Sequence, residues 1–286
     1  MNGRTSRLTL EAFLQARLHE QLEIARREEP GVRQGRERPL HNLRVALRRM
    51  RTLLRAVEPF RADPLAASVE RRLRRLLKTL GPARDMDVWL RFFRRNTVVS
   101  KRQAKRLAQA LAEKETHRRR LLGELDRPAH RRLMEDVERL AGAPVVLPVY
   151  LNPAAREALN QARLRIERRA RHAPRLSPRR LHRLRIAFRK ARYLAEFFSG
   201  VVEAPLERLA AECQALQDVL GDLHDHEVYL ARARALQPAA PAKLTRHIRR
   251  RRRLLQQRFE RQWAHHQRAE MTALWEAATK RVASIP

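Results

Sequence analysis

The sequence predicts an all-α protein made of two similar bundles of helices. Three observations favour this fold class. The stretches between helix-breaking residues are long, glycine and aromatic residues are scarce, and one phrase of the sequence occurs twice. The 286 residues include only 8 Gly, and aromatic residues make up 5%, whereas turn-rich β proteins use more of both. A chain of this length is sufficient for one or two domains that each bury a core.

Helix-breaking segments rich in Pro, Gly and polar residues divide the chain. They lie at 28–39, 123–128, 141–153, 173–178 and 237–241. Between them we expect helices at about 5–28, 40–58, 64–80, 83–95, 98–122, 153–172, 178–199, 204–220, 223–236 and 241–280. The segment 141–153 falls at the middle of the chain. We therefore interpret it as the linker between a first helical repeat, 1–143, and a second one, 144–286.

Two phrases recur in the same order. The His-Arg phrase reads HNLRVALRRMR from His41 and HRLRIAFRKAR from His182. The Leu-Gly phrase follows about forty residues later, as LGPARDMDV at 80–88 and LGDLHDHEV at 220–228. The copies are offset by 141 and 140 residues, which indicates an internal duplication of helical units. The duplication predicts two similar bundles related by a pseudo-two-fold axis.

Each copy of the His-Arg phrase, placed on a helix at about 100° per residue, has an apolar stripe and a cationic stripe. The apolar stripes, predicted to face the core, are Leu43, Ala46, Leu47, Met50, Leu54 and Val57 in the first copy and Leu184, Ala187, Phe188, Ala191 and Phe198 in the second. The cationic stripes are His41, Arg44, Arg48, Arg51 and Arg55 in the first copy and His182, Arg185, Arg189 and Arg192 in the second, with Arg49 and Lys190 at their edges. Glu196 stands where the first copy has Arg55.

The cationic stripes predict anion binding. A basic face exposed to water is the ordinary explanation of a run of charges. However, like charges at i,i+3 and i,i+4 repel each other, and a helix stabilised from within would intersperse Glu. The first stripe contains no acid. Such an arrangement becomes favourable when a chain of negative charges runs along it.

The overall charge indicates the same class of partner. Lys+Arg 64 against Asp+Glu 31 gives a net charge of +33, and because seven of the cations are Lys, 57 are Arg. Arginine grips phosphate oxygens bidentately, whereas lysine acts as a point charge. A GC-rich genome favours Arg codons, but that bias does not explain an excess of 33 charges. Self-repulsion at this level weakens the folded state unless a polyanion screens it.

The histidines lie at the predicted starts of their helices. Pro39, Ser177 and Pro178 are start signals, with Ser177 as N-cap and Pro178 at the first helical position. Free N–H groups at a helix N-terminus favour phosphate, and a bound polyanion favours protonated histidine. We therefore expect binding to tighten below neutral pH. The alternative is that each histidine only caps or packs at the helix start.

The Leu-Gly phrase predicts a break between two helices, with Gly81 as C-cap of one and Asp85 as N-cap of the next. Gly221 and Asp225 have the same predicted roles, and both aspartates are candidates to orient stripe arginines by pairing with them. In the second copy, the candidate ligands of a metal site are Asp222, His224, Asp225 and His226. The first copy offers only Arg84, Asp85 and Asp87, so we expect no metal.

Further cations extend the candidate binding site beyond the stripes. Arg75 and Lys78 belong to a cluster with Arg71, Arg72 and Arg74, and the last predicted helix carries Arg246, Arg249, Arg250 and Arg253 on adjacent turns. In the second copy, the segment that matches 71–78 reads AECQALQD. We therefore expect the cationic lining to be asymmetric.

The sequence argues against several other classes of protein. Cys213 is the single cysteine, so no disulfide framework or cysteine-based zinc site is expected. No secretory signal occurs and no apolar run reaches the roughly 18 residues that span a bilayer, which predicts a cytoplasmic protein. Trp89, Phe188 and Phe198 fit apolar faces rather than a platform for stacking bases. No helix-turn-helix, zinc-finger or RNA-module pattern is present, so the predicted ligand has phosphates and needs no base readout.

The two phrases together closely resemble the CHAD family (conserved histidine α-helical domain). The resemblance rests on His-x-x-Arg-x-x-x-Arg-(Arg/Lys)-x-Arg followed by Leu-Gly-x-x-(Arg/His)-Asp-x-(Asp/Glu)-Val, each present twice, and it covers nearly the whole chain. It implies two four-helix bundles related by pseudo-symmetry, a basic central cavity, and binding of inorganic polyphosphate, in several bacterial members at polyphosphate granules. By position, it implies that the lining residues are His41, Arg44, Arg48, Arg49, Arg51, His182, Arg185, Arg189, Lys190 and Arg192.

Many members of the CHAD family are fused to a CYTH triphosphatase domain with a Glu-rich motif. No such segment occurs here, so we expect a stand-alone CHAD protein that binds polyphosphate, or another phosphate or sulfate anion, without cofactor or catalysis. Duplex DNA and other nucleic acids are the rival partners. A phosphotransferase that uses His41 or His182 as nucleophile is a further alternative, but it needs a general acid or base and usually a metal nearby.

Overall fold

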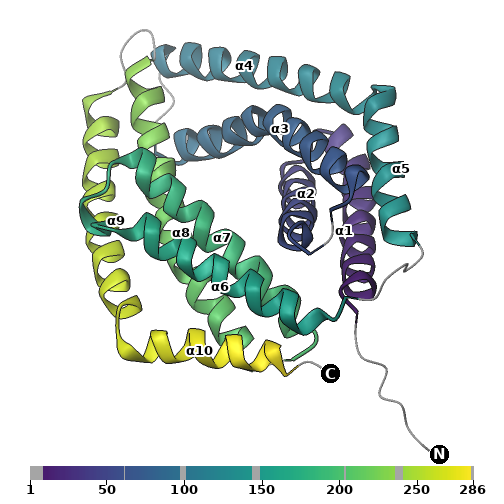
Figure 1. The fold of residues 1–286 in the computed structure, drawn as a ribbon. Coiled ribbons are helices and arrows are strands. Elements are labelled where there is room, and N and C mark those ends of the chain that lie inside the picture. Colours follow the sequence, from purple (N-terminus) through teal and green to yellow (C-terminus); the bar gives the residue numbers. More distant parts are fainter. Residues whose placement is uncertain are drawn as a thin grey trace, which may run out of the picture. The chain divides into compact units, whose positions relative to one another are not determined.

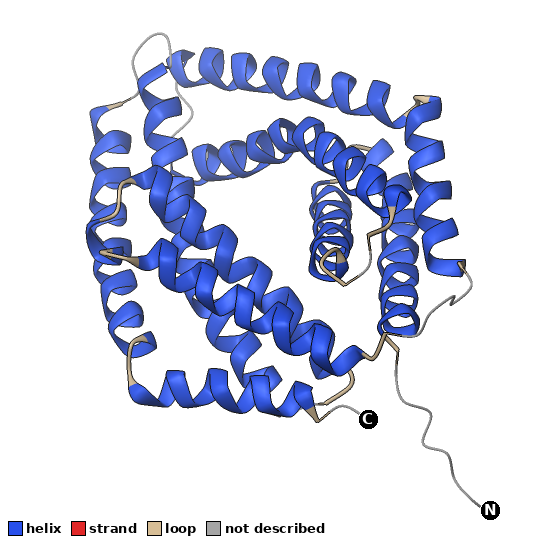
Figure 2. Ribbon diagram, viewed as in Figure 1, coloured by secondary structure: helices blue, strands red, loops and turns tan. Residues whose placement is uncertain are grey.

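The described residues of the computed structural model are 9–60, 62–96, 101–143, 149–202, 204–235 and 241–284. In these ranges the chain forms ten α-helices and one 3-10 helix, and no β-strand (Figure 2). They are α1 (Leu10–Arg33), α2 (Glu37–Val57), α3 (Pro64–Asn96), α4 (Lys101–Leu125), α5 (Pro128–Gly142), α6 (Leu151–Ala170), η1 (Ala173–Arg175), α7 (Pro178–Ser199), α8 (Leu206–Ala235), α9 (Ala242–His266) and α10 (Ala269–Ala283). The predicted all-α fold class is confirmed.

The helices belong to two compact units. The N-terminal unit, Thr9–Val149, contains α1 to α5, and the C-terminal unit, which begins at Tyr150, contains α6 to α10. In the N-terminal unit, each of α1 to α4 packs against the next helix, and α5 returns to α1 and α3 (Figure 1). In the C-terminal unit, each of α6 to α8 packs against the next helix, and α10 returns to α6 and α8. The first four helices of the two units therefore follow the same order of neighbours, and the fifth returns to the first and third in both.

The apolar stripes of the His-Arg phrase form the core of each unit. The buried side chains on α2 include Leu43, Ala46, Leu47, Met50, Leu54 and Val57, and those on α7 include Leu184, Ala187, Phe188, Ala191 and Phe198. The predicted core faces of both phrases are confirmed. The predicted start of α7 is also correct, because Ser177 is its N-cap and Pro178 its first residue. In contrast, α2 begins two residues before Pro39, at Glu37.

The predicted helix break at the Leu-Gly phrase is wrong. α3 continues through Gly81 and Pro82, and α8 continues through Gly221, so neither glycine is a C-cap. Apolar residues on both sides of the phrase explain the continuity: Leu80, Ala83 and Met86 are buried on α3, and Leu220 and Leu223 are buried on α8. Packing of these residues against neighbouring helices outweighs the low helix propensity of glycine and proline.

Other predicted boundaries also need correction. α5 was not predicted, although Pro128 occupies its first position and Leu133, Val137 and Leu140 form its buried face. The predicted helix 241–280 is two helices, which a turn at Gln267 separates. α1 extends through Pro30 to Arg33, into the predicted break at 28–39. The predicted helical residues 5–8 and 98–100, and residues 144–148 and 237–240 of two predicted breaks, lie outside the described residues.

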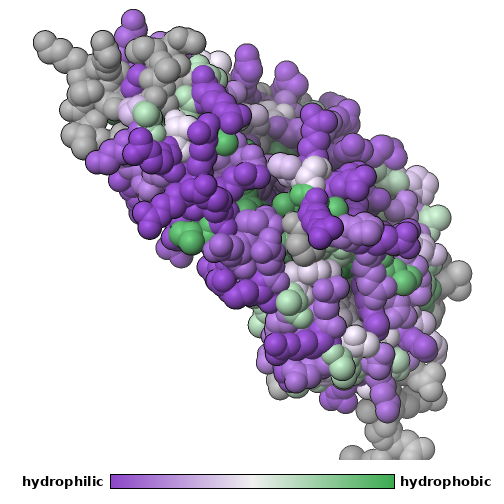
Figure 3. Space-filling view, turned by 90° about the vertical axis from the view of Figure 1, so that its left-hand side faces the viewer, coloured by the Kyte–Doolittle hydropathy of each residue, from purple (hydrophilic) through white to green (hydrophobic). Residues whose placement is uncertain are grey.

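The surface is strongly polar. On the face that Figure 3 shows, hydrophilic side chains cover most of the area, and hydrophobic ones appear only as small separate patches. None of the helices in the described ranges combines the length and the apolar character that crossing a membrane requires.

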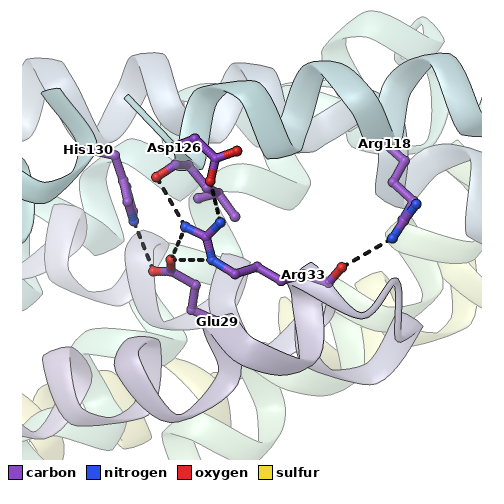
Figure 4. A network of polar contacts seen from close by, with 6 residues as sticks. Glu29, Arg33, Arg118, Asp126 and His130 are labelled. Atoms are coloured by element: carbon purple, nitrogen blue, oxygen red, sulfur yellow. Dashed lines mark hydrogen bonds and ion pairs between the residues drawn. The ribbon is translucent and has the colours of Figure 1, made fainter. Parts of the chain in front are cut away.

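A network of charged groups joins three helices of the N-terminal unit (Figure 4). His130, at the start of α5, donates from Nε2 to Glu29 of α1 at 2.9 Å, and Arg33 donates to the same carboxylate at 2.7 Å. Arg33 also bonds to Asp126, after α4, and accepts at its backbone carbonyl from Arg118 at 3.2 Å. The hydrogen bond from His130 lowers the pKa of Glu29, so the network favours the charged carboxylate.

Candidate functional site

Arg44 of the cationic stripe lies at the contact between α2 and α3. Arg44 is only 8% exposed, although arginine is almost never buried unless it is paired. A Cβ atom added at Gly81 of α3 would lie 3.3 Å from Nη1 of Arg44. The missing side chain of Gly81 therefore leaves the room in which this guanidinium lies.

The C-terminal unit repeats this arrangement with Arg185 of α7 and Gly221 of α8. A Cβ atom at Gly221 would lie 3.3 Å from Nε, 3.4 Å from Nη2 and 3.6 Å from Cζ of Arg185. Both phrases of the sequence thus meet in space in each unit, with the arginine of one against the glycine of the other. The sequence analysis missed this contact, because recurrence of the two phrases at offsets of 141 and 140 residues does not by itself say that they touch.

The ends of the cationic stripes meet carboxylates. Arg51 donates from Nε to Glu70 of α3 at 2.7 Å, and Arg55 approaches the same carboxylate at 3.8 Å. In the C-terminal unit, Arg192 lies 3.1 Å from Glu196 on its own helix. The first stripe contains no acid among its own residues, but α3 supplies one. Each stripe therefore has a partly neutralised end and a cationic part nearer its histidine.

The middle of each stripe is half-buried. Arg48 and Arg49 on α2 and Arg189 and Lys190 on α7 all have this intermediate exposure. The guanidinium of Arg192 also lies over the ring of Tyr193, with Cζ 4.8 Å from its centroid. Half-buried arginines lose less side-chain freedom when they bind a ligand than fully exposed ones, which favours tight contacts with phosphate.

The two motif histidines differ in their surroundings. His41 is exposed on α2, whereas His182 is half-buried on α7 and its ring centroid lies 4.3 Å from that of His224 on α8. Burial, and secondarily the nearby charge of Arg185, lower the pKa of His224. The N-terminal unit has the permanent cation Arg84 where the C-terminal unit has His224.

The acids of the Leu-Gly phrase bind cations of the following helix. Asp87 is 3% exposed and accepts from Nζ of Lys114 on α4 at 2.9 Å. Burial raises the pKa of Asp87, although Lys114 opposes this shift. Glu227 forms the equivalent ion pair with Arg252 of α9. The sequence analysis missed both cations, because neither belongs to a repeated phrase.

The predicted N-cap roles of Asp85 and Asp225 are wrong, because both residues lie inside continuous helices. The second-copy residues considered for a metal are also arranged differently. His226 donates from Nδ1 to the backbone carbonyl of Asp222 at 2.8 Å. In the described ranges, no three His, Cys, Asp or Glu side chains are grouped in a way that could hold a metal ion.

The remaining predicted cations lie at separate places on their helices. Arg75 lines a depression of about 530 Å³ against α5, where Arg72 bonds to Asp136. Lys78 is exposed on α3. Arg246, Arg249, Arg250 and Arg253 are exposed on α9, where Arg252 forms the ion pair with Glu227 of the Leu-Gly phrase. Within the units, the described contacts thus bring the two phrases together but do not include these six cations.

Comparisons with known proteins identify the family and the fold of the chain. The sequence pattern of the CHAD domain family matches residues 16–234. The chain belongs to the CHAD family. Its fold is similar to the crystal structure of the CHAD domain from the plant Ricinus communis, with a TM-score of 0.69 and 23% identity, over 98% of this chain and 94% of that chain.

A second solved structure, PptA from Streptomyces chartreusis, matches with a TM-score of 0.70 and 18% identity, over 89% of this chain and 98% of that one. At these identities the likeness to both structures shows the fold alone. No curated protein sequence matches the chain. The membership in the CHAD family that the sequence indicated is confirmed.

Proposed function

We propose that this CHAD protein binds inorganic polyphosphate through the cationic stripes of α2 and α7. The observation that carries the proposal is the matched setting of Arg44 and Arg185, each held beside a glycine of the neighbouring helix. The family membership supports polyphosphate as the ligand. The excess of 33 positive charges supports a polyanion rather than a single small phosphate ester.

Binding would consist of multiple arginine–phosphate contacts along each stripe. A guanidinium presents two parallel N–H groups to one phosphate, and these charge-assisted hydrogen bonds are about twice as strong as neutral ones. Each phosphate that is neutralised releases counterions from the polyphosphate chain. Affinity should therefore fall steeply with salt, with a slope that reports the number of contacts.

The placement of the aromatic residues supports polyphosphate over single-stranded nucleic acid. Proteins that bind single strands without sequence preference stack bases on exposed rings. Here Trp89, Phe188 and Phe198 are buried in the cores. In the ranges that the structure describes, Tyr150 is the only exposed Phe, Trp or Tyr side chain. A ligand made of phosphates alone fits this surface best.

We also propose that the protein binds polyphosphate without reacting with it. A phosphohistidine step at His41 or His182 would need a general acid or base. Two acids of the Leu-Gly phrase, Asp87 and Glu227, are paired with Lys114 and Arg252, which supports a binding role. Mass spectrometry after incubation with polyphosphate should detect no phosphohistidine.

The decisive experiment is a titration with long-chain polyphosphate of wild type and of a variant with Arg44, Arg48, Arg185 and Arg189 changed to Ala. We expect an affinity loss of at least about 100-fold, because four charge-assisted contacts are removed. The matched control removes four exposed arginines outside the stripes, Arg94, Arg95, Arg119 and Arg120, and so lowers the net charge equally. Equal losses in the two variants would contradict a specific site.

Competition with duplex DNA tests the rival partner. At about 0.15 M salt, exposed charges are well screened, so non-specific attraction contributes little. Duplex DNA at equal phosphate concentration should not displace polyphosphate.

In cells, we propose that the same binding places the protein in the cytoplasm at polyphosphate granules. A fluorescent fusion of the four-arginine variant should then lose the granule pattern that wild type shows.

A further inference from the structure

Gly81 and Gly221 occupy positions where glycine is unfavourable in itself. Both lie inside long helices, α3 and α8, where glycine costs stability relative to alanine because it adds backbone freedom to the unfolded chain. In the described ranges, Gly35 is the only glycine with a positive φ angle, so neither Gly81 nor Gly221 is needed for a left-handed backbone. Pro82 does disfavour a residue with a Cβ at position 81, because the residue before a proline is crowded in a helix. No proline follows Gly221, so the reason for glycine there must lie outside its own backbone.

The neighbouring side chain supplies that reason. At both positions, the atoms nearest to an added Cβ belong to the arginine of the His-Arg phrase, at 3.3 Å. Gly123 of α4 and Gly142 of α5 offer a contrast, because an added Cβ would meet nothing within 4 Å there. At Gly31 of α1 the nearest atoms belong to the ring of Pro39, at 2.5 Å, so among the helical glycines of the described ranges the two motif glycines are the ones that lie against an arginine of the His-Arg phrase.

We infer that Gly81 and Gly221 are positioning residues, which fix the guanidinium groups of Arg44 and Arg185 in the place from which they bind polyphosphate. The inference rests on the proposed function and names what sets the geometry of that site. An alanine methyl group at either position would push the guanidinium outward by a few tenths of an ångström. Bidentate pairing with phosphate depends on the direction of the two N–H groups, so this displacement should weaken binding while the helix itself gains propensity.

The two positions should respond unequally. At Gly221 the added Cβ would meet Nε, Nη2 and Cζ of Arg185, which together are most of the guanidinium. At Gly81 it would meet only Nη1 of Arg44, one terminal nitrogen of the guanidinium. Gly221→Ala should therefore reduce polyphosphate affinity more than Gly81→Ala.

The test combines binding and thermal unfolding of full-length variants. We expect Gly221→Ala to weaken polyphosphate binding about tenfold, with a Tm no lower than that of wild type, and Gly81→Ala to weaken it about threefold. Gly123→Ala is the matched control, with unchanged affinity and a Tm raised by about 2–4 °C. In an Arg185→Ala background, Gly221→Ala should change affinity less than about twofold, because its effect acts through that arginine.

The possible results separate this inference from the proposed function. If the arginine variants lose binding while Gly221→Ala binds as wild type does, the glycines do not position the site and only the inference fails. Equal losses from Gly221→Ala with and without Arg185 would overturn it as well. If changing Arg44, Arg48, Arg185 and Arg189 to Ala leaves affinity unchanged, the proposed function fails and this inference fails with it.

Discussion

The N-terminal and C-terminal units differ most at one equivalent corner. In the N-terminal unit, the corner where α1, α4 and α5 meet is held by the ionic network of Glu29, Arg33 and His130. In the C-terminal unit, the matching corner of α6, α9 and α10 is aromatic. There the ring centroid of His266 lies 5.4 Å from that of Trp263, and both residues line one cavity of about 400 Å³ with Trp275.

The offset of the duplication relates the two corners residue by residue. At the offset of 141 residues found for the His-Arg phrase, Glu29 corresponds to Ala170 and His130 to Met271. An ion pair in one unit thus stands where two apolar residues stand in the other, and His130 and Met271 are both buried. A corner that only has to be filled accepts either chemistry, whereas both units have the arginine–glycine contact that is proposed to serve the ligand.

Both units also have an ion pair between the Leu-Gly phrase and the following helix, but the two ion pairs differ in burial. The ion pair of Asp87 with Lys114 has side-chain exposures of 4% and 27%, whereas that of Glu227 with Arg252 has 29% and 44%. Buried charges are costly when their partner is removed, and exposed pairs contribute little. The same contact should therefore be essential to one unit and dispensable in the other.

The largest expected effect comes from breaking these two ion pairs. Lys114→Met should destabilise the N-terminal unit by about 3 kcal/mol at pH 7, because it leaves the Asp87 carboxylate buried and uncompensated. Arg252→Met should cost less than about 1 kcal/mol. Urea unfolding followed by circular dichroism measures both.

Two controls sharpen this prediction. The deficit of Lys114→Met should narrow as the pH falls toward 4, since Asp87, whose pKa is already raised by burial, can then become neutral. Adding Asp87→Asn to Lys114→Met should recover part of the lost stability. Equal costs for the two single variants would show that burial does not distinguish the two ion pairs.

Mild acid should destabilise the aromatic corner of the C-terminal unit but not the ionic corner of the N-terminal unit. Burial lowers the pKa of His266 to about 4, from an ordinary value of 6.5. Between these values the unfolded chain binds a proton that the folded unit does not, so stability falls as the pH falls through this window. From pH 7.5 to pH 5 the loss should be about 2 kcal/mol. The ionic corner should keep its stability over this range, because the lowered pKa of Glu29 places its titration below the usual 4.5.

Tryptophan fluorescence can measure this loss in the C-terminal unit alone. Of the three Trp residues, only Trp89 lies in the N-terminal unit, so a Trp89→Phe background leaves Trp263 and Trp275 as reporters. His266→Phe should remove most of the pH dependence, since a phenyl ring can occupy the aromatic surroundings of His266 without titrating. If acid destabilises wild type and His266→Phe equally, another group is responsible.

Apolar periodicity and the duplication were sufficient to predict the fold class and both core stripes. The apolar residues of α2 and α7 recur at helical spacing, and burial of one face is what determines how such a helix packs. The helix boundaries were harder, because Gly81, Pro82 and Pro30 are local breakers that tertiary packing overrides. α5 was missed because its three buried apolar residues lie among many charges.

The candidate site was predicted in part. The sequence identified Arg44 and Arg185 because they recur in register. It could not identify Gly81 and Gly221 as their neighbours, because local reasoning assigns a glycine after an apolar run to a helix end. Lys114 and Arg252 carried no local signal, since their roles depend on how the following helix packs against the Leu-Gly phrase. Contacts between helices that are distant in sequence are the part that single-sequence patterns do not contain.

The smallest expected effect concerns the pH dependence of binding. A bound polyphosphate chain favours protonated His224 beside His182, so binding takes up a proton and affinity rises as the pH falls. Because the pKa of free His224 is lowered, most of the rise should occur below about pH 6.5. We expect the affinity for long-chain polyphosphate to increase about threefold between pH 8 and pH 5.5.

His224→Arg copies the residue of the N-terminal unit, Arg84, into the C-terminal unit. It should flatten this pH dependence and raise affinity at pH 8, since the positive charge then no longer depends on pH. His19→Arg adds the same charge at an exposed position of α1 and should leave the pH dependence intact. An unchanged pH profile in His224→Arg would show that the histidine pair does not couple protonation to binding, and the two units would then differ at this position without consequence for the ligand.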